Sequence, residues 1–171
     1  MLAPCVSRQN MTVVGVTGPQ HLTNGESWHW VLMQLRAAVA QLPPPLLGVS
    51  SLAIGADQLF AQVVLEAGGT IKAVIPFDSY DRTFKGDDCV RYARLRNLVA
   101  SVEELPRIGS DEQCYFAAGK RVVDLSSLMI AIWNDKAAAG LGRTAEIVHY
   151  ATAAGKPVIH INPLEGTVTR K

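Results

Sequence analysis

The segment Trp133–Glu146 combines residue types that can cradle a phosphate group. Gly140 and Gly142 let the backbone approach an anion closely, and Thr144 stands where a helix is expected to begin. The first N–H groups of a helix have no partner within it, so they bind anions, and Arg143 can add a two-pronged contact. The alternative is an ordinary glycine-containing loop before a capped helix, and the glycine pair alone leaves the two interpretations equal.

Three other segments end expected strands with polar or aromatic residues, namely Gly15–His21, Ser51–Asp57 and Pro76–Phe84. The first offers a further phosphate or ribose contact, and Asp57 offers a partner for a ribose hydroxyl or a base edge. In the third, aromatic rings are suited to stacking on a base. The simpler alternatives are a plain turn, a helix cap or first-turn acid, and a partly packed loop.

The candidate ligand contacts across the four segments are Gly15, Thr17, Gly18, Pro19, Gln20, Ser51, Gly55, Ala56, Asp57, Pro76, Phe77, Tyr80, Arg82, Phe84, Trp133, Asn134, Gly140, Gly142, Arg143, Thr144 and Glu146. Within Pro76–Phe84, Tyr80 and Phe84 are the stacking candidates, and Arg82 is the anion contact. If the chain catalyses a reaction, Glu146 is the candidate for assisting attack and Arg143 for holding the phosphate. His21 is interpreted as a surface or capping histidine.

Several kinds of catalytic site are absent from the sequence. It contains no P-loop lysine motif, no HExxH motif and no Ser-His-Asp arrangement, which argues against classical ATP or GTP hydrolysis. The three cysteines, Cys5, Cys89 and Cys114, are widely spaced and match no zinc-ligand pattern. We therefore expect no metal site and no required cofactor.

Short β-branched runs alternate with longer segments of helical periodicity. The expected strands are Thr12–Thr17, Leu46–Leu52, Thr70–Ile75, Val102–Leu105, Leu128–Trp133 and Pro157–Ile161, the last being the final strand. The expected helices are Glu26–Leu42, Gln58–Ala67, Cys89–Ala100, Glu112–Leu125 and Thr144–Ala154, and Phe77–Asp88 is expected to be a loop.

This alternation predicts an α/β fold of the Rossmann-like, doubly wound type, with a mainly parallel sheet and helices on both faces. Residues 11–171 are expected to form a single domain, and residues 1–10 a flexible tail. In such sheets ligands bind at the carboxyl ends of the strands. The loops after Thr17, Leu52, Pro76 and Trp133 should therefore converge.

The composition and the charge limit the kinds of partner that we expect the chain to bind. Hydrophobic residues make up 49% of the 171 residues and charged residues 18%, which is typical of a compact fold, and the net charge is +1. Arg91, Arg94 and Arg96 form the only basic cluster, most simply a solvated helix face, so we do not expect a nucleic-acid partner. No apolar run is long enough to span a membrane, and free cysteines suit a cytoplasmic protein.

The motifs taken together resemble the SLOG superfamily, which groups the DNA-processing protein DprA, the Lonely Guy (LOG) phosphoribohydrolases and nucleotide-sensing domains. The matching segments are GVTGPQHL, SSLAIGADQLFA, VIPFDSYDRTF, LMIAIWNDKAAAGLGRTAEIVHYA and GKPVIHINP, which cover about Val13 to Pro163. The resemblance implies a Rossmann-like fold and a pocket for a nucleotide or a relative of ADP-ribose. A homodimer is a further expectation from the family.

The catalytic motif of the LOG enzymes is not reproduced. Their PGGxGTxxE loop has a glutamate three residues after the threonine, whereas Ile147 follows Thr144 at that distance and Glu146 lies two residues after it. Ala118 stands where those enzymes have an arginine, and Lys120 and Arg121 are out of register, so they point from another side of the helix. Ser127 also stands where many relatives carry aspartate.

Three hypotheses follow. The first is a binding or sensing module for a small nucleotide-type ligand such as AMP or ADP-ribose. The second is an N-glycosidic enzyme, either a nucleoside 5′-monophosphate phosphoribohydrolase or a deoxyribosyltransferase-like protein. The third is a DprA-like binder of single-stranded DNA, which the near-neutral charge argues against. We favour the first and leave open whether any turnover occurs.

Overall fold

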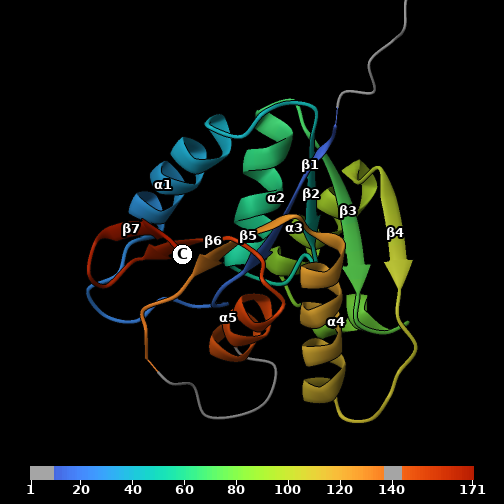
Figure 1. Cartoon of the computed structure of the whole chain (residues 1–171). Coiled ribbons are helices and arrows are strands. Elements are labelled where there is room, and N and C mark those ends of the chain that lie inside the picture. Colours follow the sequence, from blue (N-terminus) through green and yellow to red (C-terminus); the bar gives the residue numbers. More distant parts are fainter. Residues whose placement is uncertain (1–9, 137–143) are drawn as a thin grey trace, which may run out of the picture.

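The computed structural model describes residues 10–136 and 144–171 and is built on one seven-stranded sheet (Figure 1). The strands are β1 (Thr12–Thr17), β2 (Leu46–Ser50), β3 (Thr70–Ile75), β4 (Ser101–Glu104), β5 (Leu128–Ile132), β6 (Val158–Asn162) and β7 (Thr167–Arg170). Their order is β4-β3-β2-β1-β5-β6-β7, and every neighbouring pair is parallel except β6 and β7. The predicted α/β, doubly wound and mainly parallel architecture is confirmed.

Helices cover both faces of this sheet. They are α1 (Trp28–Ala40), α2 (Ala56–Glu66), α3 (Asp87–Leu98), α4 (Asp111–Leu125) and α5 (Thr144–Ala153), with a short 3-10 helix, η1, at Tyr80–Thr83. Successive strand residues point to opposite faces, so Ile130 packs with Val31 of α1 and Phe60 of α2, whereas Met129 packs with Val122 of α4. Helices α4 and α5 lie side by side on this second face (Figure 1).

The carboxyl ends of the six parallel strands form one edge of the sheet. Strand β1 lies between β2 and β5, and the chain leaves it toward α1 on one face, while β5 is followed by α5 on the other. The loops after β1 and β5 therefore diverge to opposite faces. A crevice at such a switch in strand order is where open α/β sheets bind ligands.

The sequence-based elements agree with the structure except at their ends and at two additions. The boundaries move by one or two residues, as is usual for helix ends. Strand β7 was not predicted, and Pro157–Ile161 was wrongly taken as the final strand. All four residues of β7 are exposed, so no buried alternation marks it, and pairing with β6 is what holds it. Helix η1 lies within the predicted loop Phe77–Asp88.

Among the helices that the structure describes, none is long and apolar enough to cross a membrane.

Candidate functional site

A cleft of about 650 Å³ lies at the carboxyl edge of the sheet. The loops after β1, β2, β3 and β5 form its floor and rim, and helices α4 and α5 form one wall. Small-molecule sites in proteins commonly have volumes in the range of roughly 300 to 1,000 Å³. The cleft can therefore hold a ligand the size of a single nucleotide.

Many of the predicted contacts line this cleft. They are Thr17, Gly18, Pro19, Gln20, Ser51, Asp57, Pro76, Tyr80, Trp133, Asn134 and Thr144. They come from segments far apart in the sequence, and the parallel sheet brings them together because every one of these segments follows a strand at the same edge.

Other predicted contacts are placed elsewhere. Gly15, Gly55, Ala56, Phe77, Arg82, Phe84 and Glu146 are not among the described residues that line the cleft. Gly15 lies beneath α4, where a Cβ atom would come within 2.9 Å of Val122 Cγ1. Glu146 lies in the first turn of α5. Gly140, Gly142 and Arg143 fall outside the described residues.

The aromatic residues after β3 form a packed cluster. Phe84 stacks on Tyr92 with ring centroids 4.3 Å apart, and Tyr80 meets the Phe84 ring edge-on at 5.0 Å. Phe84 and Tyr80 are both buried, but Tyr80 also borders the cleft. The expectation that Phe84 stacks on a bound base is therefore wrong, since its face is already covered by Tyr92. Arg82 is exposed on η1, away from the cleft.

The N-terminus of α2 connects the loops after β1 and β2. The backbone N–H of Ala56 donates a 3.1 Å hydrogen bond to the carbonyl of Pro19. Gly55, the residue before the helix, packs against the same loop, and a Cβ there would lie 2.5 Å from the carbonyl oxygen of Gln20. Gly55 and Ala56 are thus structural contacts between two loops, which corrects their assignment as ligand contacts.

Asp57 is a buried carboxylate that orders the loop after β2. Its Oδ2 accepts hydrogen bonds from the Ser50 hydroxyl at 3.2 Å and from the Ser51 N–H at 3.0 Å. Burial raises the pKa of Asp57 to about 6, although these two donors and the backbone of Ala53 act in the opposite direction. Asp57 is a first-turn acid of α2, as one of the simpler alternatives predicted, and it also faces the cleft.

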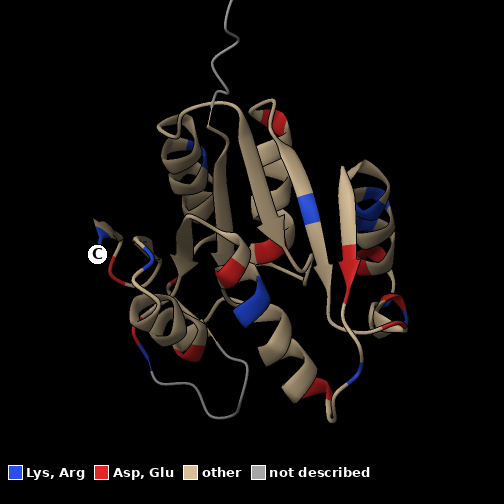
Figure 2. Cartoon of the chain, turned by 45° about the vertical axis from the view of Figure 1, so that its right-hand side comes forward, with Lys and Arg blue, Asp and Glu red and all other residues tan. Residues whose placement is uncertain are grey.

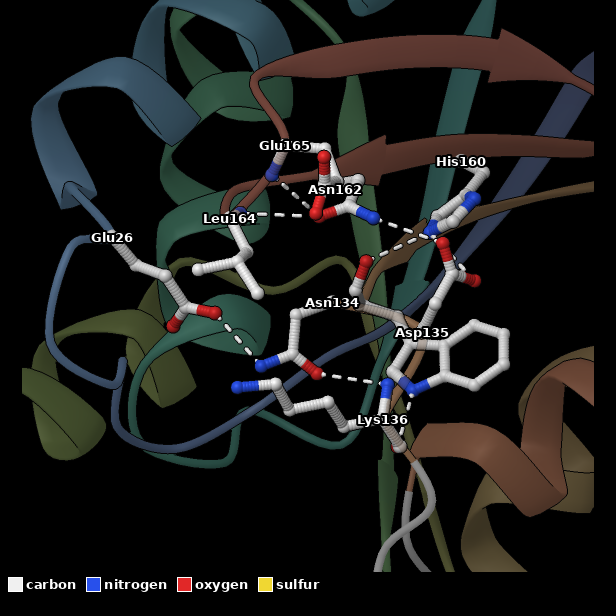
Figure 3. A network of polar contacts seen from close by, with 9 residues as sticks. Glu26, Asn134, Asp135, Lys136, His160, Asn162, Leu164 and Glu165 are labelled. Carbon is white, nitrogen blue, oxygen red and sulfur yellow. Dashed lines mark hydrogen bonds and ion pairs between the residues drawn. The ribbon is translucent and has the colours of Figure 1, made fainter.

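A second polar network joins the loops after β1 and β5 (Figure 3). Glu26 accepts hydrogen bonds from the side-chain amide of Asn134 at 2.8 Å and from the Thr23 N–H at 2.6 Å. The Oδ1 atom of Asn134 in turn accepts a 3.2 Å hydrogen bond from the Lys136 N–H. These bonds hold the two loops at a set separation across the cleft.

The segment after β5 is also held to β6. His160 Nε2 lies 2.7 Å from the carbonyl oxygen of Trp133, and the Asn162 side chain donates to Asp135 at 2.9 Å (Figure 3). His160 and Asn162 are buried. Residues 133–136 are therefore anchored on two sides before the chain reaches α5.

The network makes a quantitative prediction for Glu26 and Asn134. We expect each alanine substitution to lower the free energy of unfolding by about 1 to 2 kcal/mol, because each leaves a partly buried polar group without its partner. In a double-mutant cycle the two changes should couple by about 1 kcal/mol. Urea unfolding of the wild type, the two single variants and the double variant measures this coupling. A control cycle of Glu26→Ala with Gln41→Ala, beyond the far end of α1, should be additive.

The structure adds cleft residues that the sequence did not reveal. Among them are His21, Thr23, Glu26, Glu112, Tyr115 and Lys136. Tyr115 and Glu112 lie in the first turns of α4, where helical periodicity gave no sign that they face a ligand rather than a core or solvent. Their position near the start of a helix could have indicated that they line the cleft, because in this architecture helices begin at the carboxyl edge of the sheet. His21 is exposed, as predicted, at the rim of the cleft.

Within residues 10–136 and 144–171, no group of three His, Cys, Asp or Glu side chains is placed to hold a metal ion. The charged groups that line the cleft are Glu26, Asp57, Glu112 and Lys136, together with the titratable His21. Along α4, acidic residues lie toward both ends of the helix and basic residues lie between them (Figure 2). The described part of the site thus carries both signs of charge.

This architecture was compared with known protein families, sequences and structures. No protein-family profile matches the chain, and no curated protein sequence is similar to it. DNA processing protein A (DprA) from Streptococcus pneumoniae is similar in structure, with a TM-score of 0.63, 19% identity and coverage of 88% of this chain and 50% of DprA. DprA from Helicobacter pylori gives a TM-score of 0.60 at 16% identity, with coverage of 87% and 64%. The chain shares the Rossmann-like α/β fold of these proteins.

A further similar structure is that of the structural-genomics protein TM1055, with a TM-score of 0.53, 21% identity and coverage of 87% of this chain and 73% of TM1055. The chain spans only about half to two thirds of the two DprA proteins. At these identities the shared feature is the fold alone.

The expectation about nucleic acid is corrected by the same comparison. The H. pylori DprA structure is described as revealing a single-stranded DNA binding mode, and that protein shares the fold of this chain. A net charge near zero over the whole chain is therefore not a sound reason to exclude a nucleic-acid partner, because local groups in a cleft decide such contacts. The single-domain boundaries, the homodimer and the cytoplasmic location stay predictions.

Proposed function

We propose that the cleft binds a nucleotide or a nucleotide-derived ligand of the AMP or ADP-ribose type, and that the chain acts as a binding or sensing module. The observation that carries this proposal is the convergence of four strand-to-helix loops on one cleft of about 650 Å³ at the switch in strand order. Its lining supplies hydroxyl, amide, carboxylate and aromatic groups, which are the partners that a nucleotide requires.

The phosphate is proposed to lie at the end of the cleft nearest β5 and α5. Thr144 opens α5, so its hydroxyl and the first N–H groups of a ten-residue helix face this end. Lys136 lines the same end and supplies a positive charge. Both groups follow β5, as expected for the segment Trp133–Glu146.

Thermal unfolding in the presence of AMP, ADP-ribose and NAD tests the proposal. A ligand that binds only the folded chain stabilises it by about 2.7 kcal/mol at a hundredfold excess over Kd, so the midpoint must rise. The absence of a shift with all three compounds at millimolar concentration would contradict the proposal.

A matched pair of lysine variants tests where the phosphate lies. Lys136→Met is expected to weaken AMP binding about two- to fivefold, because the lysine is exposed and screened, and to leave adenosine binding unchanged. Lys85→Met removes the same charge at an exposed position outside the cleft and should change neither. Equal effects on AMP and adenosine would place the phosphate elsewhere.

Single-stranded DNA is a second candidate ligand, favoured by the fold shared with DprA. Two basic side chains near β3 and β4 are engaged internally, since Lys72 and Arg121 both pair with Glu103 at 3.2 Å and 2.7 Å. Fluorescence anisotropy with a labelled oligonucleotide should then show weak binding that falls steeply with added salt. No change in anisotropy at low salt would remove this candidate.

A further inference from the structure

The order of the strands gives the cleft two chemically different ends. Across the sheet the order is β3-β2-β1-β5, so residues that follow β2 and β3 lie at one end and residues that follow β5 at the other. Two to three strand spacings separate them, or about 10 to 14 Å. The β5 end carries Lys136 and Thr144, and the β2–β3 end carries Asp57 and Tyr80.

The β2–β3 end combines aromatic rings with carboxylates. Tyr80 and Tyr115 have ring centroids 6.2 Å apart, and both border the cleft. Ala118 and Gly119, on the next turn of α4 after Tyr115, also line the cleft. Asp57 and Glu112 make this end unfavourable for a phosphate. A flat, uncharged ring fits it better.

Asp57 retains capacity to accept a hydrogen bond from a ligand. Both the Ser50 hydroxyl and the Ser51 N–H donate to the same oxygen, Oδ2, and the backbone of Ala53 also stabilises the charged form. A carboxylate has about four acceptor sites, so these three donors leave one. The residue is 9% exposed and lines the cleft, so a group that enters the cleft can reach the carboxylate.

On the basis of the nucleotide function proposed above, we propose that the Asp57 end receives the base and selects a base whose exocyclic group is an amine over one that presents a carbonyl there. An amine N–H donates to the carboxylate, whereas a carbonyl oxygen opposes it with a second acceptor. Such discrimination is strong because two buried acceptors that face each other both lack a hydrogen-bond donor.

Two pairs of nucleotides that differ at this exocyclic group and at the adjacent ring nitrogen test the inference. Calorimetric titration at pH 7.5 compares AMP with IMP and CMP with UMP. The wild-type chain is expected to prefer AMP and CMP at least about tenfold, the range expected for one mismatched buried hydrogen bond. In Asp57→Asn, whose amide can present either a donor or an acceptor, the preference should fall below about threefold. Asp81→Asn, an exposed site outside the cleft, should keep the wild-type preference.

A second variant separates the base from the rest of the ligand. Tyr115→Ala removes the ring that borders the base, so it should weaken all four nucleotides and leave the affinity for ribose 5-phosphate unchanged. This comparison does not depend on the folding of Asp57→Asn. A wild-type chain that binds the four nucleotides equally would overturn the inference and leave the proposed function standing, as would an unchanged preference in Asp57→Asn. Failure of all four to bind would overturn the inference, and failure of ADP-ribose and NAD as well would overturn the proposed function.

Discussion

Replacing Gly55 with alanine is expected to cost about 3 to 5 kcal/mol of folding stability and to abolish ligand binding. Gly55 has φ 84° and ψ −117°, a conformation that residues with a Cβ rarely adopt. The added Cβ would lie 2.6 Å from the carbonyl oxygen of Pro19 and 2.5 Å from that of Gln20. Both atoms are backbone, so the loop after β1 must move and the hydrogen bond from Ala56 to Pro19 is lost.

Urea unfolding measures this cost, and Gly25→Ala is the matched control. Gly25 has a similar φ of 88°, but no atom lies within 4 Å of the Cβ position, so only the conformational cost of about 1 to 2 kcal/mol should remain. The difference between the two variants isolates the contact between the loops after β1 and β2. Equal costs for the two substitutions would show that this contact does not hold the site together.

Replacing Asp57 with asparagine is expected to stabilise the chain progressively as the pH rises. The pKa of Asp57 is about 6 in the folded chain and 3.8 without burial, so the folded state favours the protonated form. The stability that this group contributes is fully present below pH 3.8 and is lost as the pH rises through 6. Relative to the wild type, Asp57→Asn should therefore gain about 3 kcal/mol between pH 3.5 and pH 8.

Urea unfolding of the two proteins at several pH values checks this expectation. Asparagine can still accept the hydrogen bond from the Ser51 N–H, so the loop after β2 is expected to keep its conformation. Burial holds the pKa of neighbouring Tyr80 well above its ordinary value, so Tyr80 stays protonated over this range and does not obscure the result. A stability difference that is independent of pH would mean that Asp57 is solvated. Asp81→Asn, at an exposed position, serves as the control.

The two Asp57 experiments report on different properties of the same carboxylate. The unfolding experiment measures what burial costs in the absence of a ligand, and the titration measures what the carboxylate selects. If ligand selection is the reason for its burial, Asp57→Asn gains stability at neutral pH and loses discrimination together. Such an exchange of stability for function is common at binding sites.

Patterns along the chain were sufficient to predict the architecture. Runs such as Thr12–Thr17 and Leu128–Ile132 are apolar and β-branched because they are buried on both faces of a parallel sheet. Amphipathic helical segments between them require crossovers, and crossovers require parallel strands. Strand β7 was not predicted because its exposed residues carry no such pattern. Its pairing with β6 is a property of the folded chain.

The sequence by itself determined the α/β fold and the edge of the sheet at which a site can form, because periodicity reflects local burial and alternating strands and helices require parallel strands. Only the tertiary structure decided which side chains face the cleft. The ring of Phe84 is covered by Tyr92, whereas Glu26, Glu112 and Tyr115 enter from helices or their approaches. Side-chain direction at a loop depends on contacts between segments distant along the chain, such as Ala56 with Pro19 and Asn134 with Glu26, and no local pattern encodes those contacts.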